Sequence, residues 1–402
     1  MSDGNAPGLR RDARYGPVVQ TASQASTDDH EQVRAGARAV LERSWLESEG
    51  FCPPNPVVYP HQWLWDSCFH AVAWAALGDE RAGRELASCL SGALPNGFVP
   101  HMRYLGPSGG RGPLPDRSSF TQPAVYAHAA RVVRDRGLPL ASGVVPAVVA
   151  GLEWLWRSRL SPDGLLVIVH PWESGSDDSP RWDSWVGLPS YDHAAYSAWD
   201  RGLVAHTTYD ECGAAVGSSG FVCAPAAFNA FAVHAAREAF ALTADGRWQQ
   251  RADALAAAMD EHLWDERVGL WSDLPYVGDG STASVPTLDG AFGVLSTNDA
   301  ARAARVLDGW ATAGPFGLAF VPADCSSYVP DEYWRGPAWP QLNYLAGQAA
   351  LRWGRTDVHA LIASALRRAA LVSGFAEYWN PETGRGLGAV PQGWAALAAT
   401  YD

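Results

Sequence analysis

Residues 144–158 read VVPAVVAGLEWLWRS, and the spacing of their apolar side chains predicts one amphipathic helix. The side chains that follow the i, i+3, i+4 rhythm of a buried helix face are Val145, Val148, Val149, Leu152, Leu155 and Trp156. Further segments predict helices at 30–46, 61–78, 80–94, 122–136, 224–243, 246–264, 298–312, 338–353, 357–373 and 391–401. Alternating strands are scarce, and 165–169 (LLVIV) is the best short candidate. The sequence therefore predicts an all-α protein.

Long Gly/Pro-rich connections alternate with short turns between these helices. The long connections span 95–120, 160–222, 265–294 and 314–336. This alternation favours a closed toroid of helical hairpins, in which long loops over one end can build a site. An open helical array or an irregular helical domain is the alternative. Because no shift of composition marks a boundary, we expect a polar N-terminal arm over 1–28 and a single domain over 29–402.

The composition argues against several classes of protein. Hydrophobic residues make up 47% of the 402-residue chain and charged residues 18%, which is typical of a globular protein. The net charge of −13 argues against a nucleic-acid binder or a basic membrane-surface protein. We find no apolar stretch of membrane length, no secretory signal and no C-x-x-C pair among the six cysteines. We therefore expect a cytoplasmic protein that needs no metal or cofactor and binds neither nucleic acid nor membrane.

The 19 tryptophans and the acidic residues concentrate in a few segments. The first is 59–67 (YPHQWLWDS), where Trp63 and Trp65 stand beside Asp66. Stacking rings next to a carboxylate suit a sugar, which offers an apolar ring face and neighbouring hydroxyl groups. The alternative is that both rings pack in the core and that Asp66 caps a helix.

Two further segments carry single candidate residues. His101, in 96–102 (NGFVPHM), could bind substrate, although a lone histidine is more often structural. Gln122, in 119–123 (SFTQP), offers both a donor and an acceptor to a ligand. The alternative for this second segment is a capping turn with proline at the first helical position.

The segment 170–183 (HPWESGSDDSPRWD) places four carboxylates within eleven residues, beside two tryptophans and an arginine. Crowded like charges raise the pKa of at least one carboxyl group, as a general acid at neutral pH requires. A solvated acidic loop or a divalent-metal site is the alternative, although the spacing does not fit a calcium-binding loop.

Glu377 stands between aromatic residues in 375–384 (FAEYWNPETG), and 331–339 (DEYWRGPAW) has a similar composition. Burying a carboxyl group there destabilises the fold, so we expect the group to take part in catalysis or to form an ion pair. An ion pair with an arginine is the structural alternative. The chain lacks G-x-S-x-G, Walker A, G-x-G-x-x-G and H-E-x-x-H motifs. With these motifs absent, the remaining candidate is a pair of carboxylates among aromatic rings, the arrangement that glycoside hydrolases use.

At these residues the chain resembles glycoside hydrolase family 63, within its bacterial mannosylglycerate/glucosylglycerate hydrolase-like branch. The matching stretches, in the order of the family, are QWLWDSCFH (62–70), NGFVPHM (96–102), SFTQPAVYAHA (119–129), HPWESGSDDSPRWD (170–183), YWRGPAWPQLNY (333–344) and EYWNPETGRGLG (377–388). The resemblance implies an (α/α)6 barrel and an inverting mechanism on α-glycosides, without an obligatory metal. It also implies a small carbohydrate substrate, an α-glucoside or α-mannoside similar to glucosylglycerate or mannosylglycerate.

The resemblance assigns the general acid to Asp177 and the general base to Glu377. Their carboxyl groups should then lie about 6.5–9.5 Å apart, with the attacking water between. It further implies a sugar subsite formed by Trp65, Asp66, Gln122, Trp172, Trp334, Gly336 and Trp339. Additional binding candidates are Tyr59, Trp63, His101, Glu173, Gly175, Arg181 and Trp182.

The chain departs from the family in two places. Asp178 stands where the family usually has asparagine, so either Asp177 or Asp178 could carry the acid proton. The segment 186–222 matches least well, and Arg103, Tyr104 and Arg201 are candidates for holding a glycerate carboxylate. The alternatives to a hydrolase are an inactive sugar-binding toroid, or a glycan lyase or cyclase on a similar fold.

Overall fold

Helix α2 (Leu64–Ala76) is buried over its whole surface in the computed structural model. The structure describes residues 27–107, 109–188, 190–277 and 285–401. A helix that is buried on every side lies inside a protein, with other elements all around it. The outer helix α5 (Val144–Ser158) has instead one buried face, formed chiefly by Val144, Val148, Leu152 and Leu155. These two burial patterns separate an inner wall of helices from an outer one.

The inner wall is a closed ring of six segments. Each segment packs against the next around the ring, and the last packs against the first. In ring order they are α2, α4 (Tyr126–Asp135), α8 (Ala226–Thr243), α10 (Leu288–Ala291) continued by the 3-10 helix η4 (Phe292–Leu295), α12 (Pro340–Arg352) and the 3-10 helix η5 (Gly393–Thr400).

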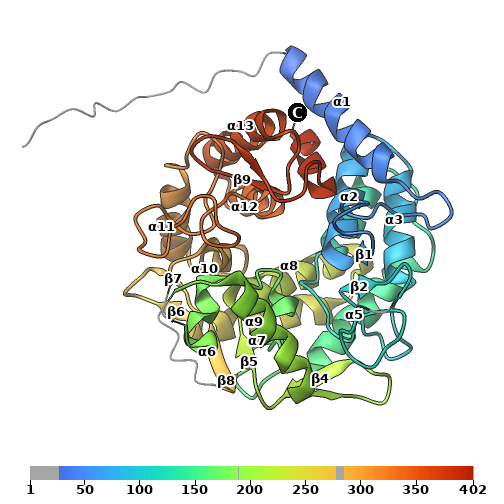
Figure 1. Ribbon diagram of the computed structural model, residues 1–402, viewed down its shortest axis with the longest axis vertical. Coiled ribbons are helices and arrows are strands. Elements are labelled where there is room, and N and C mark those ends of the chain that lie inside the picture. The colour runs from blue at the N-terminus through green and yellow to red at the C-terminus, as the bar shows by residue number, and fades with distance from the viewer. Residues whose placement is uncertain (1–26, 108, 189, 278–284, 402) are drawn as a thin grey trace, which may run out of the picture.

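An outer helix packs against each part of this ring (Figure 1). The outer helices are α1 (Thr27–Ser44), α3 (Arg81–Leu90), α5, α9 (Gly246–His262), α11 (Ala300–Trp310) and α13 (Thr356–Ser373). Asp245 and Asp299 cap α9 and α11 by accepting hydrogen bonds from backbone N–H groups of the first turn. The alternation of inner and outer helices is an (α/α)6 barrel, which confirms the predicted all-α toroid.

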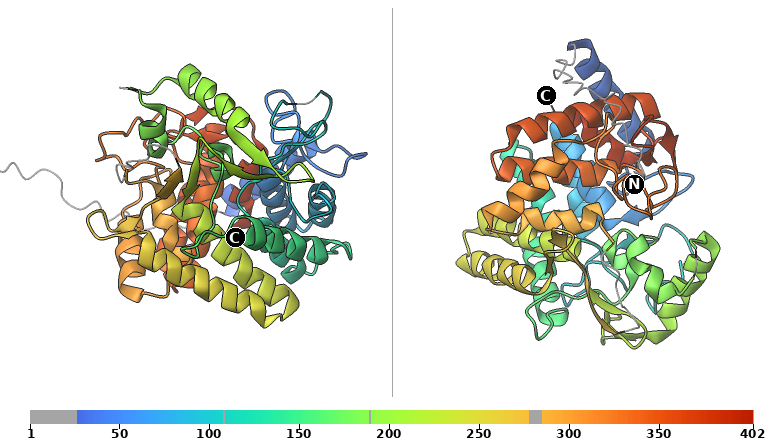
Figure 2. Two further views of the ribbon diagram at one scale, coloured as in Figure 1. Left: turned by 90° about the horizontal axis from the view of Figure 1, so that it is seen from below. Right: turned by 90° about the vertical axis from the view of Figure 1, so that its left-hand side faces the viewer.

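Short elements in the long connections cover one end of the ring (Figure 2). The helical ones are η1 (Pro171–Ser174), η2 (Pro180–Trp182), α6 (Asp183–Val186), α7 (His193–Leu203) and η3 (Val204–His206). The strands form antiparallel pairs: β1 (Gln62–Trp63) with β2 (Met102–Arg103), β3 (Thr207–Tyr209) with β4 (Ala215–Ser218), β5 (Val222–Ala224) with β8 (Leu274–Val277), β6 (Trp264–Asp265) with β7 (Leu270–Trp271), and β9 (Tyr378–Trp379) with β10 (Gly386–Leu387).

Three expectations from the sequence need correction. The candidate strand 165–169 forms only two isolated bridges, Leu166 to Leu160 and Ile168 to Cys223. The connection 160–222 carries α6 and α7, because Asp192 caps α7 and Tyr196 packs into the core. The predicted helix 391–401 is the 3-10 helix η5.

The N-terminal arm expected over 1–28 lies almost wholly outside the described residues, and α1 already begins at Thr27. Among the described helices, none combines the length and the apolar character needed to cross a membrane.

Candidate active site

Two cavities meet at Asp177 and Glu377, which line both of them. The smaller cavity has a volume of about 360 Å³ and the larger one about 770 Å³. Tyr59, Arg111 and Tyr333 also line both cavities. The two carboxyl groups therefore stand where one ligand could extend from the first cavity into the second.

Glu377 is only 3% exposed, and two donors hold its carboxylate. The Tyr59 hydroxyl donates to Oε1 at 2.9 Å, and the Ala389 backbone N–H donates to Oε2 at 2.8 Å. Gly388 has a φ of +67°, and a Cβ at that position would lie 2.4 Å from Oε2 of Glu377. Glycine at 388 thus lets the backbone approach the carboxylate closely.

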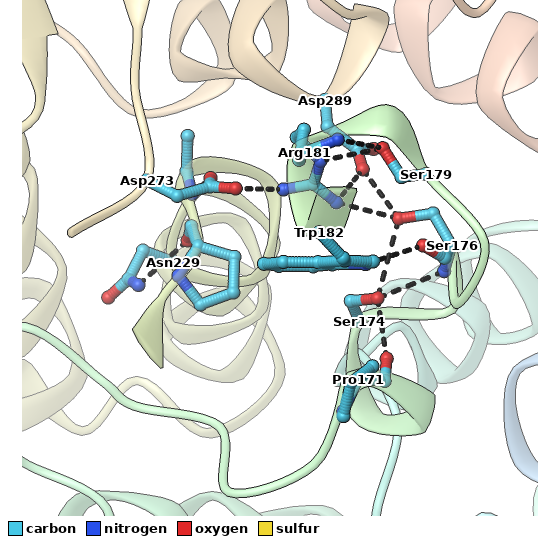
Figure 3. A network of polar contacts seen from close by, with 11 residues as sticks. Pro171, Ser174, Ser176, Ser179, Arg181, Trp182, Asn229, Asp273 and Asp289 are labelled. Carbon is cyan, nitrogen blue, oxygen red and sulfur yellow. Dashed lines mark hydrogen bonds and ion pairs between the residues drawn. The ribbon is translucent and has the colours of Figure 1, made fainter. Parts of the chain in front are cut away.

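Asp177 sits on a loop that a buried network holds in place (Figure 3). Arg181 lies between two carboxylates, donating to Asp273 at 2.5 Å and also to Asp289. The Ser176 hydroxyl accepts from Arg181 and donates to Asp289, each at 2.7 Å. The backbone on both sides of Asp177 is therefore anchored to α10 and to the segment before β8.

Asp178 lines the larger cavity only, and one of its carboxylate oxygens is held by neighbouring groups. Its Oδ2 accepts from the Tyr191 hydroxyl at 2.6 Å and lies 2.7 Å from Nδ1 of His193. Its backbone carbonyl accepts from Nε of Arg335 at 3.1 Å. Asp177, by contrast, faces both cavities, so the geometry favours Asp177 over Asp178 as the residue that reaches a ligand.

Burial keeps the carboxyl groups of Asp177 and Glu377 partly protonated near neutral pH. Burial and the negative charges of Asp178 and Asp200 raise the pKa of Asp177 to about 7. Burial also raises the pKa of Glu377 to about 7, although the Ala389 N–H and the Tyr59 hydroxyl stabilise its charged form. Each group can therefore give or take a proton at neutral pH.

Aromatic rings and buried polar groups form the wall of the smaller cavity. Side chains there that the sequence also proposed are Tyr59, Trp63, Trp65, Asp66, Gln122 and Trp334, joined by the Gly175 backbone. Trp334 stacks on Trp339 with ring centroids 3.6 Å apart and planes 5° apart. Burial raises the pKa of Asp66 well above its usual range. The cavity thus offers flat apolar faces beside hydrogen-bonding groups, as a sugar ring requires.

Two arginines line the larger cavity, and one of them, Arg201, lines that cavity alone. Arg111 and Arg201 line it, and the Arg111 guanidinium lies 4.9 Å from the centre of the Trp172 ring. Asp200 also lines it and accepts a hydrogen bond from Nε1 of Trp172 at 2.9 Å. Two cations in one pocket suit a ligand group with negative charge.

Several candidates from the sequence lie outside both cavities. These are His101, Glu173, Arg181, Trp182, Gly336 and Trp339. His101 is buried and its Nδ1 lies 3.1 Å from the Phe120 carbonyl oxygen. Glu173 forms a buried ion pair with Arg159 at 2.6 Å. These residues lie behind the wall and do not line the cavities.

Sequence reasoning missed some residues that line the site. They include Arg111, Tyr191, His193, Asp200, Tyr333, Tyr378 and Trp394. Three of them come from or next to α7, in the segment that matched the family least well. Arg103 and Tyr104, proposed with Arg201 to hold a carboxylate, line neither cavity. Arg103 instead donates to Glu49 at 3.2 Å.

The chain is similar in sequence and in fold to known glycoside hydrolases. Residues 59–395 match the family of mannosylglycerate hydrolase MGH1-like glycoside hydrolase domains. The chain is 30% identical to a mannosylglycerate hydrolase of Thermus thermophilus, over 90% of this chain and 98% of that protein. It is 28% identical to a glucosylglycerate hydrolase of Mycolicibacterium hassiacum, over 85% of this chain and 92% of that protein. The crystal structure of a GH63 mannosylglycerate hydrolase from Thermus thermophilus in complex with glucose superposes with a TM-score of 0.75 at 27% identity, covering 92% of this chain and 99% of that one.

Proposed function

The chain belongs to the MGH1-like branch of glycoside hydrolase family 63, and from this premise we propose that Asp177 and Glu377 hydrolyse a small α-glucoside or α-mannoside with an acidic aglycone. The protein is a glycosidase by its family, and that family uses inversion. The observation that carries the assignment of residues is the junction of the two cavities at these two carboxyl groups.

The smaller cavity binds the sugar to be cleaved. Its aromatic walls stack against the apolar ring face, while Asp66 and Gln122 bond to hydroxyl groups. Asp177 then protonates the glycosidic oxygen as the aglycone leaves. The raised pKa of Asp177, to about 7, supports this role because a general acid must hold its proton near the working pH.

Glu377 takes a proton from the water that attacks the anomeric carbon from the opposite ring face. Its hydrogen bonds from Tyr59 and Ala389 hold the carboxylate still and stabilise the charged form that accepts the proton. Because both oxygens are held, the water meets a base whose orientation is fixed before substrate binds.

The larger cavity binds the aglycone. Arg111 and Arg201 support an anionic aglycone, and the relatives named as mannosylglycerate and glucosylglycerate hydrolases act on sugars joined to glycerate. The net charge of −13 makes general attraction of an anion unfavourable, so its recognition depends on these local cations.

The experiment is a comparison of leaving groups with wild type and Asp177→Asn. For α-mannosyl or α-glucosyl glycerate, loss of the acid should lower kcat/KM by about 10²–10⁴-fold. The corresponding glycosyl fluoride, whose leaving group needs little protonation, should lose far less. Equal losses on both substrates would mean that Asp177 is not the general acid. Hydrolysis of neither substrate by wild type, with sugar binding retained, would favour an inactive sugar-binding toroid.

A further inference from the structure

Three potential metal ligands converge on the inner wall of the barrel, between α4 and α8. Nδ1 of His128 lies 3.1 Å from Nε2 of His234. Oε1 of Glu238 lies 3.9 Å from Nδ1 of His128 and 3.7 Å from Nε2 of His234. His234 and Glu238 are four residues apart on α8, so one helix face presents both. None of the three lines the catalytic cavities.

The spacing of these atoms fits a tetrahedral ion. Zinc binds nitrogen and carboxylate oxygen at about 2.0–2.2 Å, which places neighbouring ligand atoms of a tetrahedron roughly 3.3–3.6 Å apart. The observed separations of 3.1, 3.7 and 3.9 Å bracket that value. Two imidazoles and a carboxylate are also ligands that zinc prefers.

The surroundings orient the ligands toward a common point. The Tyr344 hydroxyl lies 2.8 Å from Nε2 of His128, so a proton on Nε2 can be shared with the phenol while the Nδ1 lone pair faces the cluster. Such a partner on the far nitrogen is usual for metal-bound histidine. The second oxygen of Glu238 is buried, has no hydrogen-bond partner among the described residues, and lies 3.6 Å from Nη1 of Arg131.

The chain holds one other group of this kind among the described residues, Cys52 with His70 and Glu85. There the Cys52 thiol donates to the Leu41 carbonyl at 3.3 Å, and Glu85 accepts from the Cys52 N–H at 2.9 Å. All three residues are 0% exposed, so an ion held by them would lie wholly in the interior. The side chains of His234 and Glu238 keep 15% and 17% exposure, so the first cluster is reachable.

We propose that His128, His234 and Glu238 bind a zinc ion that joins α4 to α8, with a water molecule as the fourth ligand. The ion is structural and takes no part in hydrolysis. It stabilises the barrel because it binds the folded arrangement, in which two helices bring the ligands together, and not the unfolded chain.

The test is metal uptake by the full-length protein after treatment with a chelator. Calorimetric titration with Zn²⁺ should show one tight site per chain. Thermal unfolding should give a higher Tm for the zinc-loaded protein than for the metal-free protein. Co²⁺ should give the intense visible absorption of a tetrahedral site, without a thiolate charge-transfer band. His234→Gln and Glu238→Gln should abolish the tight zinc binding and the Co²⁺ absorption. Tyr344→Phe should weaken zinc binding by about 10–100-fold.

Two control variants distinguish zinc binding at this site from zinc binding elsewhere on the protein. His262→Gln removes an exposed histidine at the end of α9, and Cys52→Ser removes the thiol of the second cluster; both should bind zinc like wild type. Circular dichroism of the metal-free variants establishes that each is folded. Absence of tight uptake by wild type, uptake retained in both ligand variants, or uptake lost in Cys52→Ser would overturn the proposal.

Discussion

The Tyr59 hydroxyl donates a hydrogen bond of 2.9 Å to Oε1 of Glu377 across a sequence separation of 318 residues. The contact joins the loop before β1 to the loop that follows α13 and brings both to the point where the two cavities meet. Tyr59 thereby stabilises the charged form of the proposed base and holds it in one orientation.

Tyr59→Phe should raise the pKa of Glu377, because the charged carboxylate loses a donor. A hydrogen bond to a charged group contributes about 1.5–3 kcal/mol, which corresponds to roughly 1–2 pH units. The base must be ionised to act, so the ascending limb of the pH profile of kcat/KM should move to higher pH by about that amount. The profile of the variant tests this, and an unmoved ascending limb would show that Tyr59 does not act on the base.

Asp178→Asn should lower the pKa of Asp177, because a neighbouring negative charge is removed. The acid must be protonated to act, so the descending limb of the profile should move to lower pH. Asp200→Asn should shift it in the same direction, for the same reason. The matched control is Asp253→Asn on the outer helix α9, which should leave the limb in place. A shift to higher pH in either site variant would contradict the proposed role of Asp177.

Gly388→Ala should impair catalysis more than folding. A Cβ at 388 would lie 2.4 Å from Oε2 of Glu377, so the base must move. Gly374→Ala is the matched control, because Gly374 has a φ of +70° against +67° for Gly388, yet its nearest neighbour is 3.5 Å away. The unfolding free energy of each variant should fall by about 1 kcal/mol or more. Only in Gly388→Ala should kcat also fall, by about 10-fold or more. Similar kcat values in the two variants would contradict the account.

Arg111→Gln and Arg201→Gln should weaken recognition of an acidic aglycone. Each charge-assisted contact contributes about 1.5–3 kcal/mol, so kcat/KM on the glycerate glycoside should fall by roughly 10–100-fold. The matched glycerol glycoside, which lacks the carboxylate, should be little affected. Arg103→Gln is the control because that side chain contacts Glu49 instead. Equal losses on both glycosides would argue against a carboxylate at these arginines.

The fold could be predicted from the sequence where burial imposes a helical period. In α5, Val148, Leu152 and Leu155 are buried as their spacing predicts, while Val145, Val149 and Trp156 lie at the half-buried edge of that face. The short helix α7 was missed because tertiary contacts define its place. Tyr196 packs into the core and hydrogen-bonds with Asp183, which in turn pairs with Arg335. No local pattern reveals such contacts.

In the site, too, some residues could be predicted from local sequence and others could not. Trp63, Trp65, Asp66 and Gln122 lie in compact motifs and do line a cavity. Arg181 was proposed to bind substrate from the family resemblance, but Asp273 and Asp289, about a hundred residues away, neutralise its charge in the interior. Arg111 lies in a glycine-rich loop without a motif, so only the three-dimensional arrangement places it beside Trp172.

The most direct test of the account is the configuration of the first sugar released. Wild-type protein would hydrolyse an α-linked mannosyl or glucosyl glycerate in the spectrometer, and proton NMR would follow the anomers before they equilibrate. With Asp177 as acid and Glu377 as base, water attacks from the opposite face and the β-anomer appears first. Initial release of the α-anomer would contradict the two-carboxylate inverting mechanism.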